Sequence, residues 1–205
     1  MKKQSKGFSL DGMSNYYDLI TFTEKSRFRR KQIELMGIHK GERVLEVGCG
    51  TGALSILSKI AVGESGEVVG TDIAPRMIAK AIQKAENAKL KINFKVASVN
   101  KLPYPDNTFD LVISSLMFHH LPVTLKREGM IEICRVLKKG GRFFLCDFGS
   151  PNLLTVLLMG PLFIWMSSTR FHLLGRLPAL LKASQFKSVE LIKKGIFLDY
   201  YIMRK

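Results

Sequence analysis

Three glycines in five residues separate a short apolar run from an amphipathic stretch, and this junction constrains the fold more than any other feature. The apolar run covers 43–47, the glycines are Gly48, Gly50 and Gly52, and the amphipathic stretch covers 53–62. Only glycine lets the backbone turn so tightly and lets a ligand approach it closely. The junction therefore predicts a buried strand, a tight ligand-binding loop and a helix.

The same order of apolar run and amphipathic stretch repeats along the chain. Further strands are expected at 67–70, 92–96, 109–114 and 142–147, and further helices at 75–87 and 126–137. Alternation at this spacing predicts a doubly wound α/β fold, with helices on both faces of a parallel sheet. Two final runs, 188–191 and 195–203, predict a closing hairpin. The expected sheet is seven-stranded, parallel with one antiparallel edge strand.

The 205 residues suit a single domain with a sizeable core, because the hydrophobic fraction is 46% and the charged fraction 24%, both near globular averages. Residues 1–42 precede the first strand and are expected to form an N-terminal helical lid beside the glycine loop. Residues 43–147 form the predicted binding core, 148–187 an apolar insertion on the substrate side, and 188–205 the closing hairpin.

The charge balance and the cysteines bear on partners and compartment. A formal net charge of +15 permits nucleic acid, an anionic membrane or an acidic substrate as partner. The basic residues are spread over several segments, which favours scattered solvated faces over a nucleic-acid groove. Cys49, Cys134 and Cys146 are widely spaced and form no CxxC or metal-ligand pattern. With no apolar targeting segment at the start, the expected compartment is the cytoplasm.

The residues around the glycine loop narrow the class of ligand. Together with Ala53 the glycines satisfy the GxGxxA pattern of dinucleotide sites, and Asp72 lies about twenty residues further on, where a carboxylate can bind ribose. Glu46 favours a different nucleoside. A carboxylate two positions before Gly48 would repel a pyrophosphate but would attract an ammonium or sulfonium group. S-adenosylmethionine carries both cations and no phosphate.

Residues 46–52 resemble the first motif of the class I S-adenosylmethionine-dependent methyltransferases. The resemblance continues through 70–73, 102–112 and 135–142, which are similar to the second motif, the approach to the fourth strand and the entry to the fifth. It covers about residues 40–150, and the joint occurrence of these segments in order is specific. The resemblance implies a Rossmann-like domain that binds S-adenosylmethionine and releases S-adenosyl-L-homocysteine.

The resemblance also implies roles for individual residues. Asp72 would bind both ribose hydroxyls, and Ile73 and Met77 would flank adenine, although ordinary helix packing explains Met77 equally well. Ser98 stands where related enzymes often have an aspartate for the adenine amino group. The expected cofactor-binding residues are Tyr16, Glu46, Gly48, Cys49, Gly50, Thr51, Gly52, Asp72, Ile73, Met77, Ser98, Val99, Ser114 and Ser115.

His119 and His120 follow the fourth strand, where a doubly wound fold has its crevice. An imidazole is half-deprotonated near about pH 6.5, so either histidine could act as a general base. Both could equally hold the loop by hydrogen bonds without touching a substrate. No third ligand of suitable spacing accompanies them, and no metal site is expected.

Residues 153–166 form an apolar run unexpected in a plain soluble domain. As a helix this run would span about 21 Å, less than the roughly 30 Å hydrocarbon core, so a transmembrane helix is not expected. Segment 148–189 contains no acidic residue but includes four basic ones, Arg170, Arg176, Lys182 and Lys187. This pattern favours a lipophilic pocket or peripheral membrane contact through 153–187 as strongly as a buried core helix.

Two further segments bear on the methyl acceptor. Residues 14–19, followed by 29–31, and residues 147–151 resemble segments of the quinone-biosynthesis C-methyltransferases. This resemblance implies a small, lipophilic acceptor such as a quinone precursor, with a lipid amine as the alternative. An RNA methyltransferase is permitted by the charge, but the chain has no appended binding module. A non-catalytic S-adenosylmethionine-binding protein is the third alternative, because Ser98 replaces a carboxylate.

Overall fold

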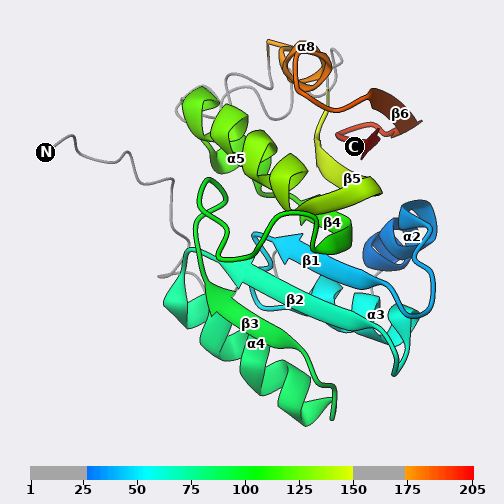
Figure 1. Ribbon diagram of the computed structural model, residues 1–205, viewed down its shortest axis with the longest axis vertical. Coiled ribbons are helices and arrows are strands. Elements are labelled where there is room, and N and C mark those ends of the chain that lie inside the picture. Colours follow the sequence, from blue (N-terminus) through cyan, green and yellow to red (C-terminus); the bar gives the residue numbers. More distant parts are fainter. Residues whose placement is uncertain (1–26, 150–173) are drawn as a thin grey trace, which may run out of the picture.

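The computed structural model describes residues 27–149 and 174–205, which form one seven-stranded sheet with helices on both sides (Figure 1). The strand order is β3-β2-β1-β4-β5-β7-β6. The strands are β1 Arg43–Val47, β2 Glu67–Asp72, β3 Asn93–Val96, β4 Phe109–Ser115, β5 Leu137–Phe148, β6 Ser188–Lys194 and β7 Leu198–Arg204. The helices are α2 Arg27–Met36, α3 Ala53–Val62, α4 Pro75–Asn87, the short 3-10 helix η2 Phe118–His120, α5 Val123–Val136 and α8 Leu177–Lys182.

The predicted α/β fold, with its N-terminal helix and closing hairpin, is confirmed. Strands β1 to β5 pair in parallel, and β7 pairs antiparallel with both β5 and β6. The single antiparallel strand therefore lies one place inside the edge, and β6 is the edge strand. The β6–β7 connection is short, so the two strands pair as a hairpin.

The observed element boundaries differ from the prediction by three residues or more in α5, β5, β6 and β7, and by at most two residues elsewhere. β1, α3 and α4 begin and end at the predicted residues, whereas α5 begins at Val123 rather than at residue 126. β5 begins at Leu137 rather than at residue 142, so it contains Gly140 and Gly141. Leu137 pairs with Phe109 of β4, and the N–H of Gly140 donates to the carbonyl oxygen of Lys205. Long-range partners thus extend this strand.

The core has two layers, one on each face of the sheet. Successive residues of a strand point to opposite faces, so Leu45 and Phe143 pack with side chains of α5 and α8. Their neighbours Val44 and Phe144 pack with side chains of α2 and α3. Burial on both faces explains why the central strands are continuous apolar runs.

The strand order reverses at β1, which has β2 on one side and β4 on the other. Connections leave the two strands in opposite directions, and this opens a crevice at their carboxyl ends. The loops after β1 and β4 border that crevice. A Cβ atom at Gly48 would lie only 2.3 Å from Cγ of Met117, so the two loops are in contact.

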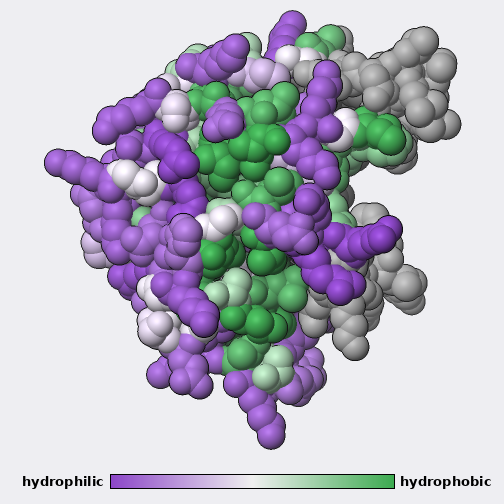
Figure 2. Space-filling model, turned by 90° about the vertical axis from the view of Figure 1, so that its right-hand side faces the viewer, coloured by the Kyte–Doolittle hydropathy of each residue, from purple (hydrophilic) through white to green (hydrophobic). Residues whose placement is uncertain are grey.

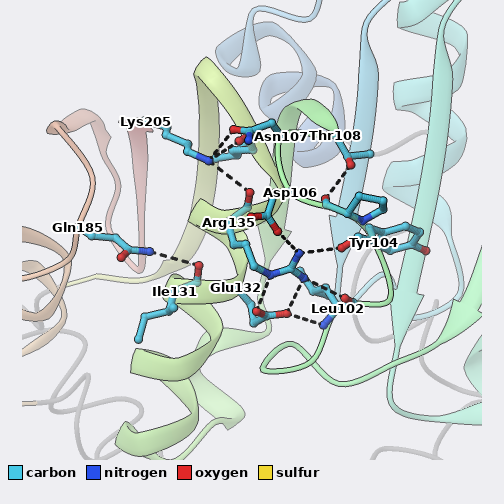
Figure 3. Close-up of polar contacts among 12 residues, drawn as sticks. Leu102, Tyr104, Asp106, Asn107, Thr108, Ile131, Glu132, Arg135, Gln185 and Lys205 are labelled. Carbon is cyan, nitrogen blue, oxygen red and sulfur yellow. Dashed lines mark hydrogen bonds and ion pairs between the residues drawn. The ribbon is translucent and has the colours of Figure 1, made fainter.

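Arg135 of α5 fixes the segment that leads into β4 (Figure 3). Its guanidinium donates to the carbonyl oxygens of Tyr104 at 2.8 Å and Leu102 at 3.1 Å. It also pairs with Glu132 at 2.8 Å and with Asp106 at 2.7 Å. A planar group with five donors suits such a cluster of acceptors. The segment that resembles the family's approach to the fourth strand is therefore bonded to α5.

Arg142 of β5 plays a similar part at the end of α2. It forms an ion pair with Glu42 at 2.7 Å, and both side chains are only 13% exposed. Its Nε donates to the carbonyl oxygen of Met36 at 3.0 Å, and Nη2 donates to that of Gly37. These bonds fix the carboxyl end of α2 against the sheet.

The side of the molecule that carries α2 and β6 has a mixed surface. Figure 2 shows hydrophobic side chains gathered in a band along the middle of this face, with hydrophilic side chains on both sides of it. A groove of about 330 Å³ between α2 and strands β6 and β7 is lined by Leu35, Ile192 and Ile202, among others. Within residues 27–149 and 174–205, no helix has the length and apolar character needed to cross a membrane.

Candidate cofactor and acceptor site

The glycine loop after β1 takes up the tight turn that the sequence predicts. Gly48, Gly50 and Gly52 have φ angles of 74°, 55° and 79°, in the left-handed region that favours glycine. The N–H groups of Gly48 and Cys49 both donate to the carbonyl oxygen of Thr71, at 2.7 and 2.9 Å. A Cβ atom at Gly52 would lie 2.9 Å from Cβ of Ala81. Side chains at these positions would thus strain or displace the loop.

Asp72 ends β2 and binds the glycine loop directly. One carboxylate oxygen accepts the N–H of Gly50 at 2.9 Å, and the other accepts the N–H of Ala74 at 2.9 Å. Each oxygen of an ionised carboxylate can accept a second hydrogen bond. Asp72 therefore holds the loop in place and keeps the chemical capacity to bind a ribose diol, as the resemblance implies.

Glu46 lies beneath the same loop, at the end of β1, and is only 2% exposed. The hydroxyl of Ser55 donates to its carboxylate. Burial raises the pKa of Glu46 to about 7; the negative charge of Asp72 adds to the rise and the positive charge of Arg29 opposes it. A buried carboxylate whose ionised form is disfavoured by desolvation is stabilised when a cationic group binds beside it.

Two other predicted residues of the loop have partners within the protein. Thr51 is buried, and its hydroxyl accepts a hydrogen bond from Nζ of Lys84 at 3.0 Å. Burial raises the pKa of the Cys49 thiol well above its ordinary value. Cys49 is therefore a protonated, buried side chain, and its place in the site comes from its backbone.

The residues predicted to surround adenine lie around the ends of β2 and β3. The N–H of Ala97 donates to the carbonyl oxygen of Asp72, which brings the end of β3 beside the end of β2. Ile73 is 43% exposed, whereas Met77 is 2% exposed and Val99 6%. The Ser98 hydroxyl donates to the side chain of Asn100 at 2.6 Å. The adenine role of these residues stays a prediction.

Of the two predicted serines at the end of β4, Ser115 contacts α2. Nε2 of Gln32 donates to the hydroxyl of Ser115 at 2.7 Å. Ser114 is fully buried, and among the described residues neither its hydroxyl nor the amide oxygen of Gln32 has a hydrogen-bond partner. Buried polar atoms without partners are rare and are often completed by a ligand or water.

Helix α2 supplies two polar residues that the sequence analysis did not select. Arg29 and Gln32 are buried, at 8% and 0% exposure, and share one helical face with Met36. The spacing of Arg29, Gln32 and Met36 by three and four positions is the sequence signal that could have revealed this buried face, because residues so spaced lie on the same side of a helix. Tyr16, the predicted cofactor contact of the N-terminal segment, lies outside the described residues, as does the apolar segment 153–166.

The two histidines after β4 occupy different surroundings. His119 is 7% exposed, and its Nδ1 lies 2.9 Å from a carboxylate oxygen of Asp147, at the end of β5. His120 is partly buried, and the centroid of its ring lies 3.9 Å from that of His119. Asp147 and the nearby Lys126, both fully buried, were missed by the sequence analysis, since nothing local marks them as partners of a histidine.

These positions bring the glycine loop, the carboxylates, the serines and the histidines to one end of the sheet. The family model described as a methyltransferase domain matches residues 38–200. The chain belongs to the methyltransferase domain family. The match includes every predicted cofactor-binding residue except Tyr16. It confirms the predicted class, S-adenosylmethionine-dependent methyltransferase, and the predicted cofactor.

Relatives and solved structures support the same family. The chain is 33% identical over 162 residues to the ubiquinone/menaquinone biosynthesis C-methyltransferase UbiE of Erwinia tasmaniensis, covering 78% of this chain and 61% of that protein. The chain thus spans less than two thirds of this relative's length. A structure of the PH0226 protein from Pyrococcus horikoshii has a TM-score of 0.71 at 26% identity, covering 97% of this chain and 99% of that one. A SAM dependent methyltransferase from Aquifex aeolicus has a TM-score of 0.68 at 22% identity, covering 96% and 98%.

Proposed function

We propose that this methyltransferase transfers the methyl group of S-adenosylmethionine to a ring carbon of a small, lipophilic quinol. The main support is a pair of carboxylates at the crevice. Glu46 is buried beneath the glycine loop near the end of β1, and Asp72 lies at the end of β2. They suit a ligand with a cationic amino acid at one end and a ribose at the other.

In this proposal each carboxylate holds one part of the cofactor. Glu46 faces the ammonium group, Asp72 accepts hydrogen bonds from the ribose hydroxyls, and the loop of Gly48, Gly50 and Gly52 leaves room for the ligand to approach the backbone. Ile73, Ser98 and Val99 lie on the adenine side, and Ser114 and Ser115 on the methionyl side. When bound, the cofactor supplies a methyl group on a sulfonium leaving group, and the protein positions the acceptor and excludes water.

Two observations support a lipophilic acceptor. The name of the Erwinia relative specifies quinone biosynthesis and C-methylation. In addition, a groove of about 800 Å³ between α5 and α8 is lined by apolar side chains that include Met130 and Leu180, and also by Arg127 and Arg176. An apolar lining next to two cations suits an amphiphile or an anionic lipid surface. Peripheral membrane contact is therefore part of the proposal.

The cofactor half is tested by calorimetry with S-adenosylhomocysteine. Asp72→Ala is expected to weaken binding by about 1.5 to 3 kcal/mol, the usual loss for a charged hydrogen-bond partner. Gly50→Val is expected to abolish measurable binding. Gly63→Val is the matched control, because Gly63 also has a positive φ of 73°, has open space around its Cβ position and caps α3 at its far end. Unchanged affinity in both site variants would refute the assignment.

The acceptor half is tested by transfer of a labelled methyl group to four samples: a short-chain 1,4-naphthoquinol with an unsubstituted ring carbon, phosphatidylethanolamine, total RNA and buffer alone. The proposal expects label on carbon of the quinol only. Label on the lipid amine or on RNA would replace the proposed acceptor by that one. S-adenosylhomocysteine binding without transfer to any sample would favour the non-catalytic alternative.

Membrane contact is tested by sedimentation with liposomes. Arg176 and Lys182 are exposed on α8, and Lys89 and Lys91 are exposed before β3. The double variant Arg176→Glu, Lys182→Glu is expected to lose about 2 kcal/mol of binding to phosphatidylglycerol liposomes at low salt, at about 1 kcal/mol per residue. The control Lys89→Glu, Lys91→Glu makes the same charge change elsewhere and is expected to lose much less. An equal loss of liposome binding in both double variants would indicate a general effect of net charge and would refute membrane contact through α8.

A further inference from the structure

A buried carboxylate holds the loop that carries His119. Asp147 ends β5, is fully buried, and accepts three N–H contacts on its two oxygens. One oxygen lies 2.9 Å from Nδ1 of His119 and accepts the backbone N–H of Phe148 at 2.7 Å. The other accepts the backbone N–H of His119 at 3.2 Å. Main chain and ring of the same histidine are thus bound to one carboxylate.

This geometry determines which ring nitrogen carries the proton. An ionised carboxylate can only accept hydrogen bonds, so Nδ1 must be the donor of the 2.9 Å contact. In the neutral imidazole Nε2 then has the lone pair and is the basic atom. A carboxylate that orients a histidine in this way also stabilises the imidazolium that forms when Nε2 takes up a proton.

The surroundings favour an ionised Asp147. Lys126 of α5 is fully buried, and Nζ donates to the carbonyl oxygen of Leu121, directly after η2. Burial lowers the pKa of Lys126 to about 8, and the negative charge of Asp147 opposes that change. Within residues 27–149 and 174–205, further titratable groups near the pair are His120, whose ring is adjacent to that of His119, and Asp199, which lies opposite Asp147 in the β5–β7 register.

We propose that Asp147 is a positioning residue that holds His119 as the Nδ1–H tautomer, so that Nε2 is the atom that takes the proton of the methyl acceptor. The inference rests on the proposed function for the identity of that acceptor. It adds a residue that the resemblance does not supply and explains why His119, rather than His120, serves as the base. His119 lies directly beyond β4, on the loop that contacts the glycine loop through Met117.

With a quinol as acceptor, a hydroxyl proton moves to His119 and the methyl group moves to a ring carbon. The O–H bond of the acceptor breaks, its electron pair stays on oxygen, and the proton moves to Nε2 of His119. The electron-rich ring carbon forms the new bond to the methyl group, while the pair of the sulfur–carbon bond stays on sulfur. The ring carbon then loses its hydrogen as a proton to solvent, which restores aromaticity, and His119 returns its proton to the phenolate oxygen, which gives the methylated quinol.

The tautomer is tested without an acceptor, by ¹⁵N spectra of the histidine rings at pH 8.5 in the protein alone and with S-adenosylhomocysteine. His119 is assigned by its loss in His119→Gln. The proposal expects a protonated Nδ1 and an unprotonated Nε2 in both samples. Asp199→Asn is the matched control, because it neutralises another buried carboxylate, whose hydroxyl partner is Tyr201 at 3.4 Å; it should leave this pattern unchanged. A proton on Nε2 of His119 in the parent protein would overturn the proposal.

The positioning role is tested by a double-mutant cycle of Asp147→Asn and His119→Gln with the naphthoquinol. Asp147→Asn is expected to lower kcat at least about tenfold in the parent, with the KM of the acceptor and the affinity for S-adenosylhomocysteine changed less than about threefold. In the His119→Gln background the same change should alter kcat less than about threefold, because Asp147 acts through His119.

A merely structural anchor would behave differently. If Asp147 only held the loop through the backbone N–H groups, Asp147→Asn would lower kcat equally in both backgrounds and would weaken S-adenosylhomocysteine binding, which overturns the proposal. If the naphthoquinol is not methylated at all, the proposed acceptor fails while the ring spectra still decide the tautomer. The two failures are therefore distinguishable, and the cycle is then run with whichever sample accepted the label.

Discussion

Replacing Glu46 by Gln should make the protein more stable and its cofactor affinity weaker. Burial raises the pKa of Glu46 from 4.5 to about 7. The folded state therefore binds a proton at this site more tightly than the unfolded chain does, so the contribution of Glu46 to stability is fully present below about pH 4.5 and is lost as the pH rises to about 7. A shift of about 2.5 units corresponds to about 3 kcal/mol.

The variant Glu46→Gln keeps the shape of the side chain and can still accept the hydrogen bond from Ser55, but it never ionises. Its free energy of unfolding at pH 8 should exceed that of the parent by up to about 3 kcal/mol, or roughly 6 to 12 °C in Tm for a chain of this size. The difference should shrink toward zero near pH 4.5. Affinity for S-adenosylhomocysteine at pH 8 should fall by about 1.5 to 3 kcal/mol, because the ammonium loses its charged partner.

The assay is urea unfolding of parent and variant at pH 5, 6, 7 and 8, with calorimetry at pH 8. Glu42→Gln is the matched control with the opposite sign. Burial tends to raise the pKa of Glu42, but hydrogen bonds from Arg142 and His39 outweigh it and lower that pKa. Glu42→Gln should therefore destabilise the protein, most strongly above about pH 4.5. A Glu46→Gln variant that is less stable than the parent at pH 8, or a stability difference independent of pH, would refute the reasoning.

Three further predictions concern other parts of the site. Gly48→Ala should lower both thermal stability and S-adenosylhomocysteine affinity, because its Cβ would lie 2.3 Å from Cγ of Met117. The control Gly37→Ala has φ 56° and no neighbour within 4 Å of its Cβ position, so thermal melts should show only the backbone strain of about 1 kcal/mol. Lys126→Met should stabilise the protein below about pH 8, because burial lowers the pKa of Lys126 from 10.5 to about 8. The parent therefore gains stability as the pH rises from about 8 to about 10.5, and urea unfolding of the variant should lack this gain. Arg29→Met should raise the pKa of Glu46 further, so that less of Glu46 is ionised at pH 7 than at pH 9. Calorimetry should then show a larger loss of S-adenosylhomocysteine affinity at pH 7, and Arg30→Met, a change of the exposed neighbour, should show no such pH dependence.

The fold could be predicted largely from local signals. The bounds of β1, α3 and α4 follow from an apolar run, a set of glycines and a proline at the first turn of a helix, all of which act over a few neighbouring residues. The glycine loop is predictable for the same reason, because positive φ angles restrict the residue type at the position itself. Asp72 was also predictable, since its distance from the loop is fixed by one helix and one strand.

The partners of these residues were decided only by the tertiary structure. The ring of His119 and the carboxylate of Asp147 meet because β4 and β5 are neighbours in the sheet, and no periodicity in the sequence connects their positions. Likewise Arg142 binds Met36 at the end of α2 across a separation of 106 residues, and Arg29 of the same helix acts on the charge of Glu46. The sequence by itself determined the elements and the ligand-binding loop, because backbone preferences are local. The tertiary structure decided the burial and the hydrogen-bond partners of the site residues, because both depend on residues that are distant in the chain.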